Sequence, residues 1–334
     1  MKSITIADVA KQSNVSKSTV SQYLNQRYQY MGEETKLRIE NAIAELGYRP
    51  NIVARSLKQK STTTIGVIVA NILHAFSTQV IRAIEDVCHE HDFHTIVCNA
   101  DDDPEKEKKY IEMLHAKQVD GLIIFPTGGN TALFKRMKSS RYPLVIMDRL
   151  LEDLAFPAVI LDNETAATLA VDHFVDRGYR SIGIMTTSIK HNITPRIDRI
   201  KGYKKALENH GIPVKDDYIK SLDLPHFEGA LEEMLSLQTP PRALLAGNDL
   251  ALMEILKFIK KKSLRIPEDV ALIGIDDVSF ASFYNPALTA VSQPAFKMGE
   301  KAAELLMKKI QDENGAIDEE VHRFEPELIE RDSC

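Results

Sequence analysis

Residues 5–25, TIADVAKQSNVSKSTVSQYLN, decide the first part of the fold. Thr5 and Asp8 form a capping-box-like pair, which predicts that a first helix begins there. After a polar break, Ser16 is a suitable N-cap for a second helix over residues 17–24. Apolar side chains recur at helical spacing on one face of each helix: Ile6, Val9, Ala10, Val20 and Leu24. Two short helices joined by a tight turn predict a helix-turn-helix arrangement.

A third helix over residues 33–46 is expected to close this small core, and Gly47 supplies the left-handed residue that ends it. Its expected buried side chains are Leu37, Ile43 and Leu46. We therefore predict an N-terminal all-α helix-turn-helix domain over residues 1–48.

The outward face of the second helix is polar, and a helix-turn-helix unit places this face in the major groove of DNA. Lys17 suits guanine, Gln22 suits adenine, and Ser18 is a third candidate for contacts with base edges. Hydroxyl groups on the helix and at its start are candidates for phosphate contacts: Ser16, Thr19 and Ser21. The competing interpretation is a helical bundle that binds protein.

Residues 49–60, RPNIVARSLKQK, follow this domain, and we predict a hinge helix or linker over residues 49–61. Pro50 favours an extended residue before it, and Asn51 is a suitable N-cap. Such a helix is shorter than the ~12–15 residues needed for marginal stability in water, so it should form only against a partner. Leu57 among cations has the composition of a minor-groove wedge. The residues expected at DNA here include Asn51, Arg55, Leu57 and Lys58. The alternative is a solvated linker.

Charge is distributed unevenly along the chain. Residues 1–60 contain ten Lys and Arg against five Asp and Glu, while the remainder contains 32 basic and 43 acidic residues. A basic head on an acidic body is typical of a nucleic-acid reader attached to a small-molecule sensor.

The composition predicts an ordinary globular protein of two or three domains, with 334 residues and 44% hydrophobic content. No apolar run approaches the ~20 residues of a membrane span, and the N-terminus lacks an apolar signal-peptide core. We therefore expect a cytoplasmic protein without membrane association. Cys88, Cys98 and Cys334 have no paired spacing, which argues against a disulfide framework and a zinc site.

From residue 64 onward, apolar strands alternate with amphipathic helices. The expected strands are residues 65–70, 95–98, 121–125, 144–148, 159–162, 182–185, 243–246 and 271–275. The expected helices include residues 78–90, 105–116, 166–177, 200–210, 249–261 and 297–311. This alternation predicts buried parallel sheets, and the number of strands predicts two similar doubly wound halves.

Polar side chains follow several of these strands, where ligands bind in open α/β sheets. They are Asn71, His74 and Ser77 near Phe76, then Asp148, Arg149, Asn248, Asp249, Asp276 and Asp277. Carboxylates and amides bind pairs of hydroxyl groups, and an aromatic face covers sugar C–H groups. The same residue types are also common helix caps and turn formers.

The opening of the chain resembles the Lac repressor/galactose repressor family of regulators. The resemblance rests on TIADVAKQSNVSKSTVSQYLN, then EETKLRIENAIAELGYRPNIVARSLKQKST and TIGVIVANI. It implies a dimer whose hinge helices order on operator DNA, with the minor-groove leucine at Leu57 and neighbouring contacts at Ala54 and Lys58. Gln22 departs from the arginine frequent at that position, which leaves the operator sequence open.

The resemblance continues through AGNDLALMEIL, RIPEDVALIGIDD, LTAVSQP and LIERDS. It implies a two-lobed α/β effector domain of the periplasmic-binding-protein-like type I, over residues 62–334. Three strands would cross between lobes near Asp162, Ser292 and Glu320. The N-lobe would then hold about 62–162 plus 292–320, and the C-lobe about 163–291 plus 321–334. The implied effector contacts are Arg199, Asn248 and Asp276, then His74, Phe76, Asp148, Arg149, Arg196 and Gln293, with Asn71 nearby.

Arg149, Arg196 and Arg199 with His74 favour an acidic ligand, because a guanidinium group forks onto a carboxylate or phosphate. The runs KSTVSQYLNQRY and VANILHAFSTQ are also similar to a ketodeoxygluconate-regulon repressor subgroup. We expect a sugar acid, with neutral sugars and nucleobases as alternatives.

Other motifs do not favour catalysis or a cofactor. Gly128-Gly129 is in neither a dinucleotide nor a P-loop pattern, and we assign it to a turn. His89, His91 and His94 straddle a helix end and are expected at the surface without a metal. We find no catalytic residues and expect no cofactor. A two-domain enzyme and a transport-type solute-binding protein remain the alternatives.

The expected function is therefore a repressor of a carbohydrate-catabolism operon, a DNA-binding transcription regulator that is not an enzyme. A homodimer would bind a pseudo-palindromic double-stranded operator and be switched allosterically by a sugar or sugar acid. The tail after Arg331 is too short for a tetramerisation helix, so the dimer is the simplest assembly.

Overall fold

The computed structural model describes residues 4–29, 31–49, 61–151, 153–311 and 319–334. The chain divides into two compact units, Met1–Thr62 and Thr63–Cys334. This division lies next to the boundary expected at residue 62. Of the hinge predicted over residues 49–61, residues 50–60 lie outside the described residues.

The first unit contains α1 (Ile6–Gln12), α2 (Lys17–Leu24) and α3 (Glu33–Leu46). The Thr5 backbone N–H donates to the Asp8 carboxylate at 2.8 Å, and the Thr19 N–H donates to Ser16 Oγ at 3.1 Å. Gly47 ends α3 in the left-handed region, with a φ of 59°. The predicted helix-turn-helix unit is confirmed, together with the capping residues that start its first two helices.

One core prediction for this unit was wrong. Leu37 is 58% exposed, whereas Ile39 and Ala42 are buried. Ile43 and Leu46 pack beside them, so the buried stripe runs at helical spacing from Ile39. Leu37 lies two positions earlier, about 200° around the helix from Ile39, and therefore points away from the core.

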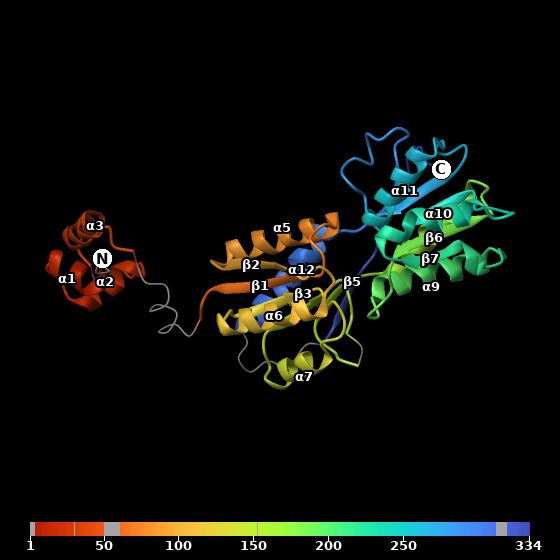
Figure 1. Cartoon of the computed structure of the whole chain (residues 1–334). Helices are drawn as coiled ribbons and strands as arrows, with labels where there is room; N and C mark the ends of the chain where they lie inside the picture. The colour runs from red at the N-terminus through yellow and green to blue at the C-terminus, as the bar shows by residue number, and fades with distance from the viewer. Residues whose placement is uncertain (1–3, 30, 50–60, 152, 312–318) are drawn as a thin grey trace. The chain divides into compact units, whose positions relative to one another are not determined.

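The second unit consists of two lobes, each built on a six-stranded sheet (Figure 1). The N-lobe sheet contains β1 (Thr64–Val69), β2 (His94–Asn99), β3 (Gly121–Ile124), β4 (Leu144–Met147), β5 (Ala158–Leu161) and β11 (Val321–Phe324). The C-lobe sheet contains β6 (Ile182–Thr187), β7 (Ile219–Leu222), β8 (Ala243–Ala246), β9 (Ala271–Ile275), β10 (Thr289–Ser292) and β12 (Glu327–Ile329).

The two sheets have the same topology. Their strand orders are β11-β5-β4-β3-β1-β2 and β12-β10-β9-β8-β6-β7, and every pairing is parallel except that of β12 with β10. Strands such as LVIM in β4 and ALLA in β8 are buried at every residue, which is the pattern of a parallel sheet covered on both faces. The prediction of two similar doubly wound halves is confirmed.

Helices cover both faces of each sheet (Figure 1). In the N-lobe, α5 (Ala75–Glu90) and α12 (Ala295–Gln311) pack together on one face, and α6 (Pro104–Ala116) and α7 (Thr131–Ser139) cover the other. In the C-lobe, α8 (Asn163–Asp176) packs on α9 (Thr194–Asn209), and α10 (Phe227–Leu235) with α11 (Asp249–Lys261) covers the opposite face. Short 3-10 turns span Asp216–Tyr218 and Leu224–His226.

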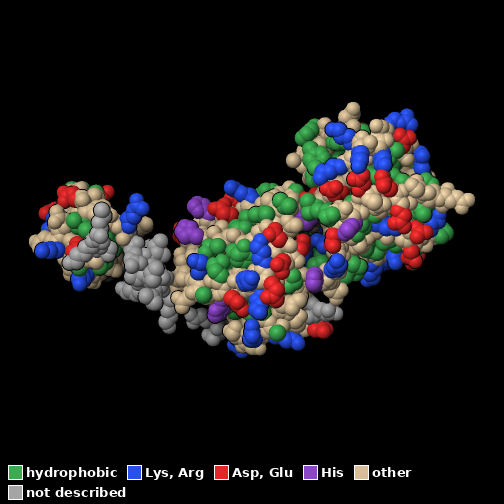
Figure 2. All heavy atoms as spheres, in the orientation of Figure 1, with side chains coloured by type: hydrophobic (Ala, Val, Ile, Leu, Met, Phe, Trp, Pro, Cys, Tyr) green, Lys and Arg blue, Asp and Glu red, His purple; other side chains and the backbone are tan. Residues whose placement is uncertain are grey.

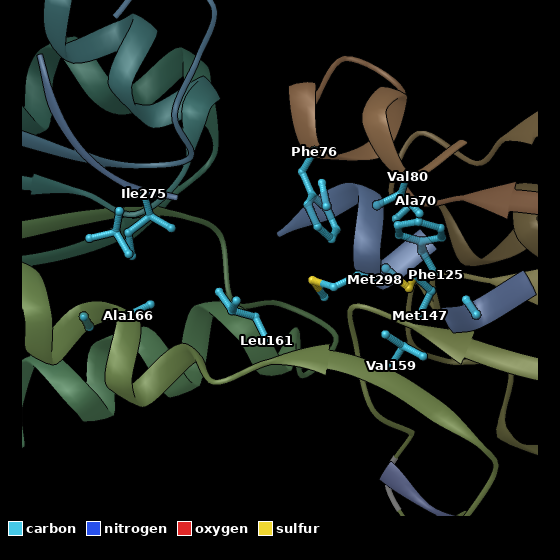
Figure 3. Packing of buried hydrophobic residues seen from close by; sticks show 14 of the residues in the cluster. Ala70, Phe76, Val80, Phe125, Met147, Val159, Leu161, Ala166, Ile275 and Met298 are labelled. Atoms are coloured by element: carbon cyan, nitrogen blue, oxygen red, sulfur yellow. The ribbon is translucent and has the colours of Figure 1, made fainter. Parts of the chain in front are cut away.

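The largest cluster of buried hydrophobic residues includes side chains from both lobes. In Figure 3, Phe76, Phe125 and Met298 gather in the N-lobe, while Ile275 lies in the C-lobe. Leu161, at the end of β5, lies between them, where the chain leaves the first sheet. The lobes are therefore joined by packed apolar side chains as well as by the connecting strands.

The chain passes between the lobes after β5, between β10 and α12, and between β11 and β12. The third crossing was expected near Glu320, with residues 321–334 in the C-lobe. That boundary was wrong, because Val321–Phe324 pairs with β5 in the N-lobe sheet. This edge strand alternates exposed and partly buried residues, so it lacks the continuous apolar run that marked the other strands.

Sequence patterns also missed some elements and starts. No element was assigned to β7, α7 or α10, and α9 begins at Thr194 and not at residue 200. Pro195 lies in the first turn of α9, where its missing N–H costs nothing. The earlier start matters because it places Arg196 and Arg199 on the helix.

Basic and acidic side chains are interspersed over the face of the second unit shown in Figure 2. At the end of α11, Lys261 is paired with Glu228 of α10, and Lys262 lies 2.6 Å from Glu232 of the same helix. Such exposed pairs contribute at most about 1 kcal/mol each. Among the residues that the structure describes, no helix is long and apolar enough to cross a membrane.

Candidate functional site

A pocket of about 450 Å³, including its open mouth, lies at the carboxyl ends of strands from both lobes. Its lining residues are Asn71, His74, Phe76, Ser77, Asp148, Arg149, Ile193, Pro195, Arg196, Arg199, Asn248, Asp276 and Gln293. All ten candidate ligand-binding residues from the sequence lie on this pocket. The carboxyl ends of parallel strands face one edge of a sheet, which explains why residues far apart in the chain meet here.

The N-lobe contributes an aromatic wall. Phe76 lies in the first turn of α5, and its ring packs edge-on against Phe125 with a centroid separation of 6.4 Å. Phe76 is only 7% exposed, so its orientation is determined by the N-lobe core (Figure 3). This ring presents a rigid apolar surface beside polar groups, which suits the C–H face of a sugar.

Two arginines of the pocket, one from each lobe, converge on Asp102. Arg149, which follows β4, places Nη2 2.8 Å from Asp102 Oδ1. Arg196 on α9 places Nη2 3.6 Å from Asp102 Oδ2. Arg149 also donates to the Pro126 carbonyl at 3.1 Å. Asp102 therefore connects the N-lobe to the C-lobe through two guanidinium groups.

These charges affect one another. Burial and the positive charge of Arg149 lower the pKa of Arg196 to about 10. Burial raises the pKa of Asp102, but the guanidinium groups of Arg149 and Arg196 outweigh it, so that the net pKa lies below its usual value. At neutral pH the cluster therefore contains a carboxylate between two charged guanidinium groups.

Arg199, one turn further along α9, has different surroundings. Its Nε donates to Asn163 Oδ1 at 2.8 Å and its Nη1 donates to the Gly247 carbonyl at 2.6 Å. Both acceptors are neutral, and no carboxylate among the described residues forms an ion pair with Arg199. Its charge acts on the Asp276 carboxyl group, where it lowers the pKa against the effect of burial, but no ion pair holds it, so it can also bind an anionic ligand although the side chain is only 4% exposed.

The carboxyl group of Asp276, which follows β9, is held by two donors. Gln293 Nε2 donates to Oδ1, and the Asp249 backbone N–H donates to Oδ2 at 3.3 Å. Burial raises the pKa of Asp276 to about 6, and the negative charge of Asp249 adds to the rise. This carboxyl group therefore binds a proton more readily than an ordinary aspartate.

A second contact between the lobes joins the start of α11 to the start of α5. Asp249, the first residue of α11, accepts from the Ala75 backbone N–H at 2.7 Å, and its Oδ1 lies 2.5 Å from His74 Nδ1. Burial raises the pKa of Asp249, but the hydrogen bonds from His74 and Ala75 outweigh it, and the net pKa is lowered. A C-lobe carboxylate thus caps the N-terminus of the N-lobe helix α5, which lacks a side-chain cap of its own.

Sequence reasoning missed three residues of this arrangement. Asp102 follows β2 within an acidic run, and Asn163 begins α8, so both lie just beyond a strand end as the candidates do. Asp249 was noted after its strand but was not selected as a site residue. Each of them follows a strand, and this position would have identified them. Residues after a strand should therefore be counted as site candidates even when they can also be explained as helix caps.

The structure describes the expected base-reading residues of α2, but not those of the hinge. Lys17, Ser18 and Gln22 are exposed. Ser16 and Thr19 share a hydrogen bond of 2.9 Å between their hydroxyl groups, in addition to the cap. Ser21 is half-buried on α2, and the hinge candidates lie outside the described residues: Asn51, Ala54, Arg55, Leu57 and Lys58.

Comparisons with known proteins agree with this architecture. The model of bacterial regulatory proteins of the lacI family matches residues 5–51, and a periplasmic binding protein-like domain matches residues 171–334. The chain is 47% identical over 332 residues to a probable HTH-type transcriptional regulator, EndR, of Paenibacillus polymyxa, covering 98% of each chain. It is 34% identical to the HTH-type transcriptional regulator KdgR of Bacillus subtilis, covering 93% of each.

Solved structures agree as well. A crystal structure of the Lac repressor dimer bound to operator and the anti-inducer ONPF is 25% identical, with a TM-score of 0.84 and 99% of each chain covered. The helix-turn-helix unit, the two doubly wound lobes and the full-length relatives lead to one conclusion. The chain belongs to the lacI family and is a DNA-binding transcription regulator with an effector-binding domain, not an enzyme.

Proposed function

We propose that this protein is a dimeric repressor of a carbohydrate-catabolism operon that binds a pseudo-palindromic operator and is switched by a sugar acid. The observation that carries the ligand class is the uncommitted charge of Arg199, whose hydrogen-bond acceptors are neutral. A guanidinium group with free donors in a buried pocket suits a carboxylate. Phe76 beside it suits the carbon skeleton of a sugar.

The operator role rests on the polar face of α2. Lys17 and Ser18 are exposed at the start of the helix, where a helix-turn-helix unit meets base edges, and Gln22 is exposed further along it. A two-fold dimer reads two half-sites, which favours a pseudo-palindromic sequence. The similar Lac repressor structure is that of a dimer bound to its operator, which supports the same assembly here. We place this regulator in the cytoplasm, where it would meet DNA.

A neutral sugar is the second candidate ligand, because carboxylates oppose the other two arginines. Asp102 lies beside Arg149 and Arg196, and Asp148 Oδ2 lies 3.6 Å from Arg149 Nε. Because these carboxylates offset part of the positive charge of the arginines, the pocket attracts an anionic ligand less strongly than three unpaired arginines would. Hydroxyl groups of a neutral sugar would then bind to Asp276, Asn248 and Gln293.

Calorimetric titration of the full chain with a panel of sugar acids and matched neutral sugars tests the ligand class. We expect sugar acids to bind. Arg199→Met should weaken their affinity by at least tenfold, because the variant loses one charge-assisted hydrogen bond to the ligand. Lys201→Met on the same helix is the matched control, because Lys201 is exposed and paired with Glu164. Binding of neutral sugars alone would favour the second candidate.

A gel-shift assay with the DNA upstream of its own gene tests the operator role. Leu57→Ala should weaken operator binding while leaving the ligand affinity of the free protein unchanged, since a wedge residue acts only on DNA. Equal operator affinity in the variant would remove the wedge role of Leu57.

A further inference from the structure

The arginine cluster contains a carboxylate that does not itself line the pocket. Asp102 is absent from the pocket wall, yet it contacts two residues of the wall, Arg149 and Arg196, at 2.8 Å and 3.6 Å. A ligand therefore meets Asp102 only through these two guanidinium groups. Arg149 and Arg196 are less than a tenth exposed, while the Asp102 side chain is 29% exposed, so bulk water screens these charges less than it screens fully exposed ones.

The backbone holds Asp102 in this position. Its N–H donates to the Ala70 carbonyl at 2.7 Å, which ties the loop after β2 to the end of β1. Asp101 and Asp102 both have left-handed backbones, with φ of 53° and 55°. Asp and Asn tolerate this region better than most residues. The loop thus aims one carboxylate, Asp102, at the arginines and the other, Asp101, at Lys106 on the surface.

We propose that Asp102 determines the ligand charge that this pocket accepts: together with Asp148 it balances Arg149 and Arg196, while Arg199 forms no ion pair among the described residues. The inference rests on the proposed function, because it takes the pocket to bind an acidic small molecule. The pocket then suits a ligand with one carboxylate, and a second anionic group finds its guanidinium partners already engaged by Asp102. Asp102 is a positioning residue that acts through the arginines and touches no ligand.

Charge chemistry gives the expected size of the effect. Replacement of Asp102 by Asn keeps the shape and the left-handed backbone but removes one negative charge beside two pocket cations. An unopposed charge near a partly buried anion changes affinity by about tenfold or more. Asp101→Asn is the matched control, since it makes the same change one residue away, with the same backbone conformation, at a side chain that is 54% exposed.

The first experiment measures inorganic sulfate, which needs no knowledge of the natural ligand. Sulfate affinity of the full-length protein is measured by calorimetry at constant ionic strength set with chloride. We expect Asp102→Asn to bind sulfate about tenfold more tightly than the wild type. Asp101→Asn should bind sulfate with the same affinity as the wild type. The double variant Asp102→Asn/Arg196→Gln should not show the increase in sulfate affinity seen in Asp102→Asn. Equal sulfate affinity in Asp102→Asn and Asp101→Asn overturns the proposal.

The second experiment uses three probes with one carbon skeleton: D-glucitol, D-gluconate and D-glucarate, which carry zero, one and two carboxylates. The ratio of glucarate to glucitol affinity should rise about tenfold in Asp102→Asn and remain unchanged in Asp101→Asn. A purely structural role would weaken all three probes equally, and that result overturns the proposal. If no sugar probe binds any variant while sulfate binding still rises, the sugar-acid function fails and the role of Asp102 stands.

Folding of the variants is checked by urea unfolding. If Asp102→Asn does not fold, Arg196→Gln in the wild-type background tests the same balance from the other side. It removes one cation and leaves Asp102 in place, so sulfate affinity should fall about tenfold. Unchanged sulfate affinity would contradict the proposal.

Discussion

The helix-turn-helix unit and the pocket of the effector domain hold their functional side chains in opposite ways. Lys17, Ser18 and Gln22 on α2 are exposed, so the small core beneath them does not depend on them. Arg196 and Arg199 on α9 are buried and hydrogen-bonded to backbone carbonyls and side chains. Substitutions of these three α2 residues should therefore change binding alone, whereas substitutions in the pocket should change binding and stability together.

The largest expected effect on stability comes from a change in the packing of α9, the helix that carries Arg196 and Arg199. Gly202 on α9 lies against α8, and a Cβ there would be 2.2 Å from the Glu164 carbonyl oxygen. Gly202→Ala gains up to about 1 kcal/mol of helix propensity, but the clash with backbone costs about 3 kcal/mol or more. We expect a clear net loss of stability in urea unfolding, with weaker ligand binding. Gly229→Ala on α10, where a Cβ meets nothing within 4 Å, is the control and should be neutral or stabilising.

Arg199→Met tests the comparison directly. The change leaves the buried Asn163 Oδ1 and Gly247 carbonyl without their donor, which costs about 2 kcal/mol in unfolding free energy. Lys17→Met on α2 should weaken operator binding and change stability by less than about 0.5 kcal/mol. The contrast between the two units breaks down if both variants lose similar stability.

Asp276 should make the stability of the effector domain depend on pH. Its pKa is raised to about 6 in the folded protein, so between about pH 4 and 6 the folded state binds more protons than the unfolded state. Asp276 therefore opposes folding increasingly as pH rises through this window. We expect the stability of Asp276→Asn relative to the wild type to increase from pH 4 to pH 7, by about 2 kcal/mol. A relative stability independent of pH would show that Asp276 has an ordinary pKa.

Ser16→Ala should destabilise the helix-turn-helix unit alone, and by less than Gly202→Ala or Arg199→Met destabilises the effector domain. Ser16 Oγ accepts the Thr19 N–H at 3.1 Å, and loss of such an N-cap costs about 1 kcal/mol. Hydrogen exchange should rise in α2 and remain unchanged in α9. Ser16 is also a candidate phosphate contact, so operator affinity should fall as well. If the wild type and Ser16→Ala show equal hydrogen-exchange rates in α2, the cap contributes no stability.

The sequence was informative where short-range rules apply. The bounds of α2, α3, β8, β9 and α11 agree with the predicted ranges, because caps and apolar periodicity act over a few residues. The ten pocket candidates also lie together, because the carboxyl ends of parallel strands share one edge. Their roles toward a ligand remain predictions.

Leu37 and β11 show where the same rules fail. A hydrophobic residue does not reveal which side of α3 faces the core, and Leu37 is 58% exposed. β11 is a partly exposed edge strand that joins the N-lobe only through its pairing with β5. Both outcomes depend on packing between elements and not on local pattern.

By itself, the sequence determined the helix-turn-helix unit, the two doubly wound lobes, the family and the pocket edge at which polar side chains gather. Only the tertiary structure decided how those charges are matched. Asp102 and Arg196 are far apart in the chain and come from different lobes, yet they lie 3.6 Å apart, while Arg199 has only neutral acceptors. Residue types and spacing give the number of charged side chains in the pocket. The distances between these charges in the folded protein decide which guanidinium group remains available to a ligand.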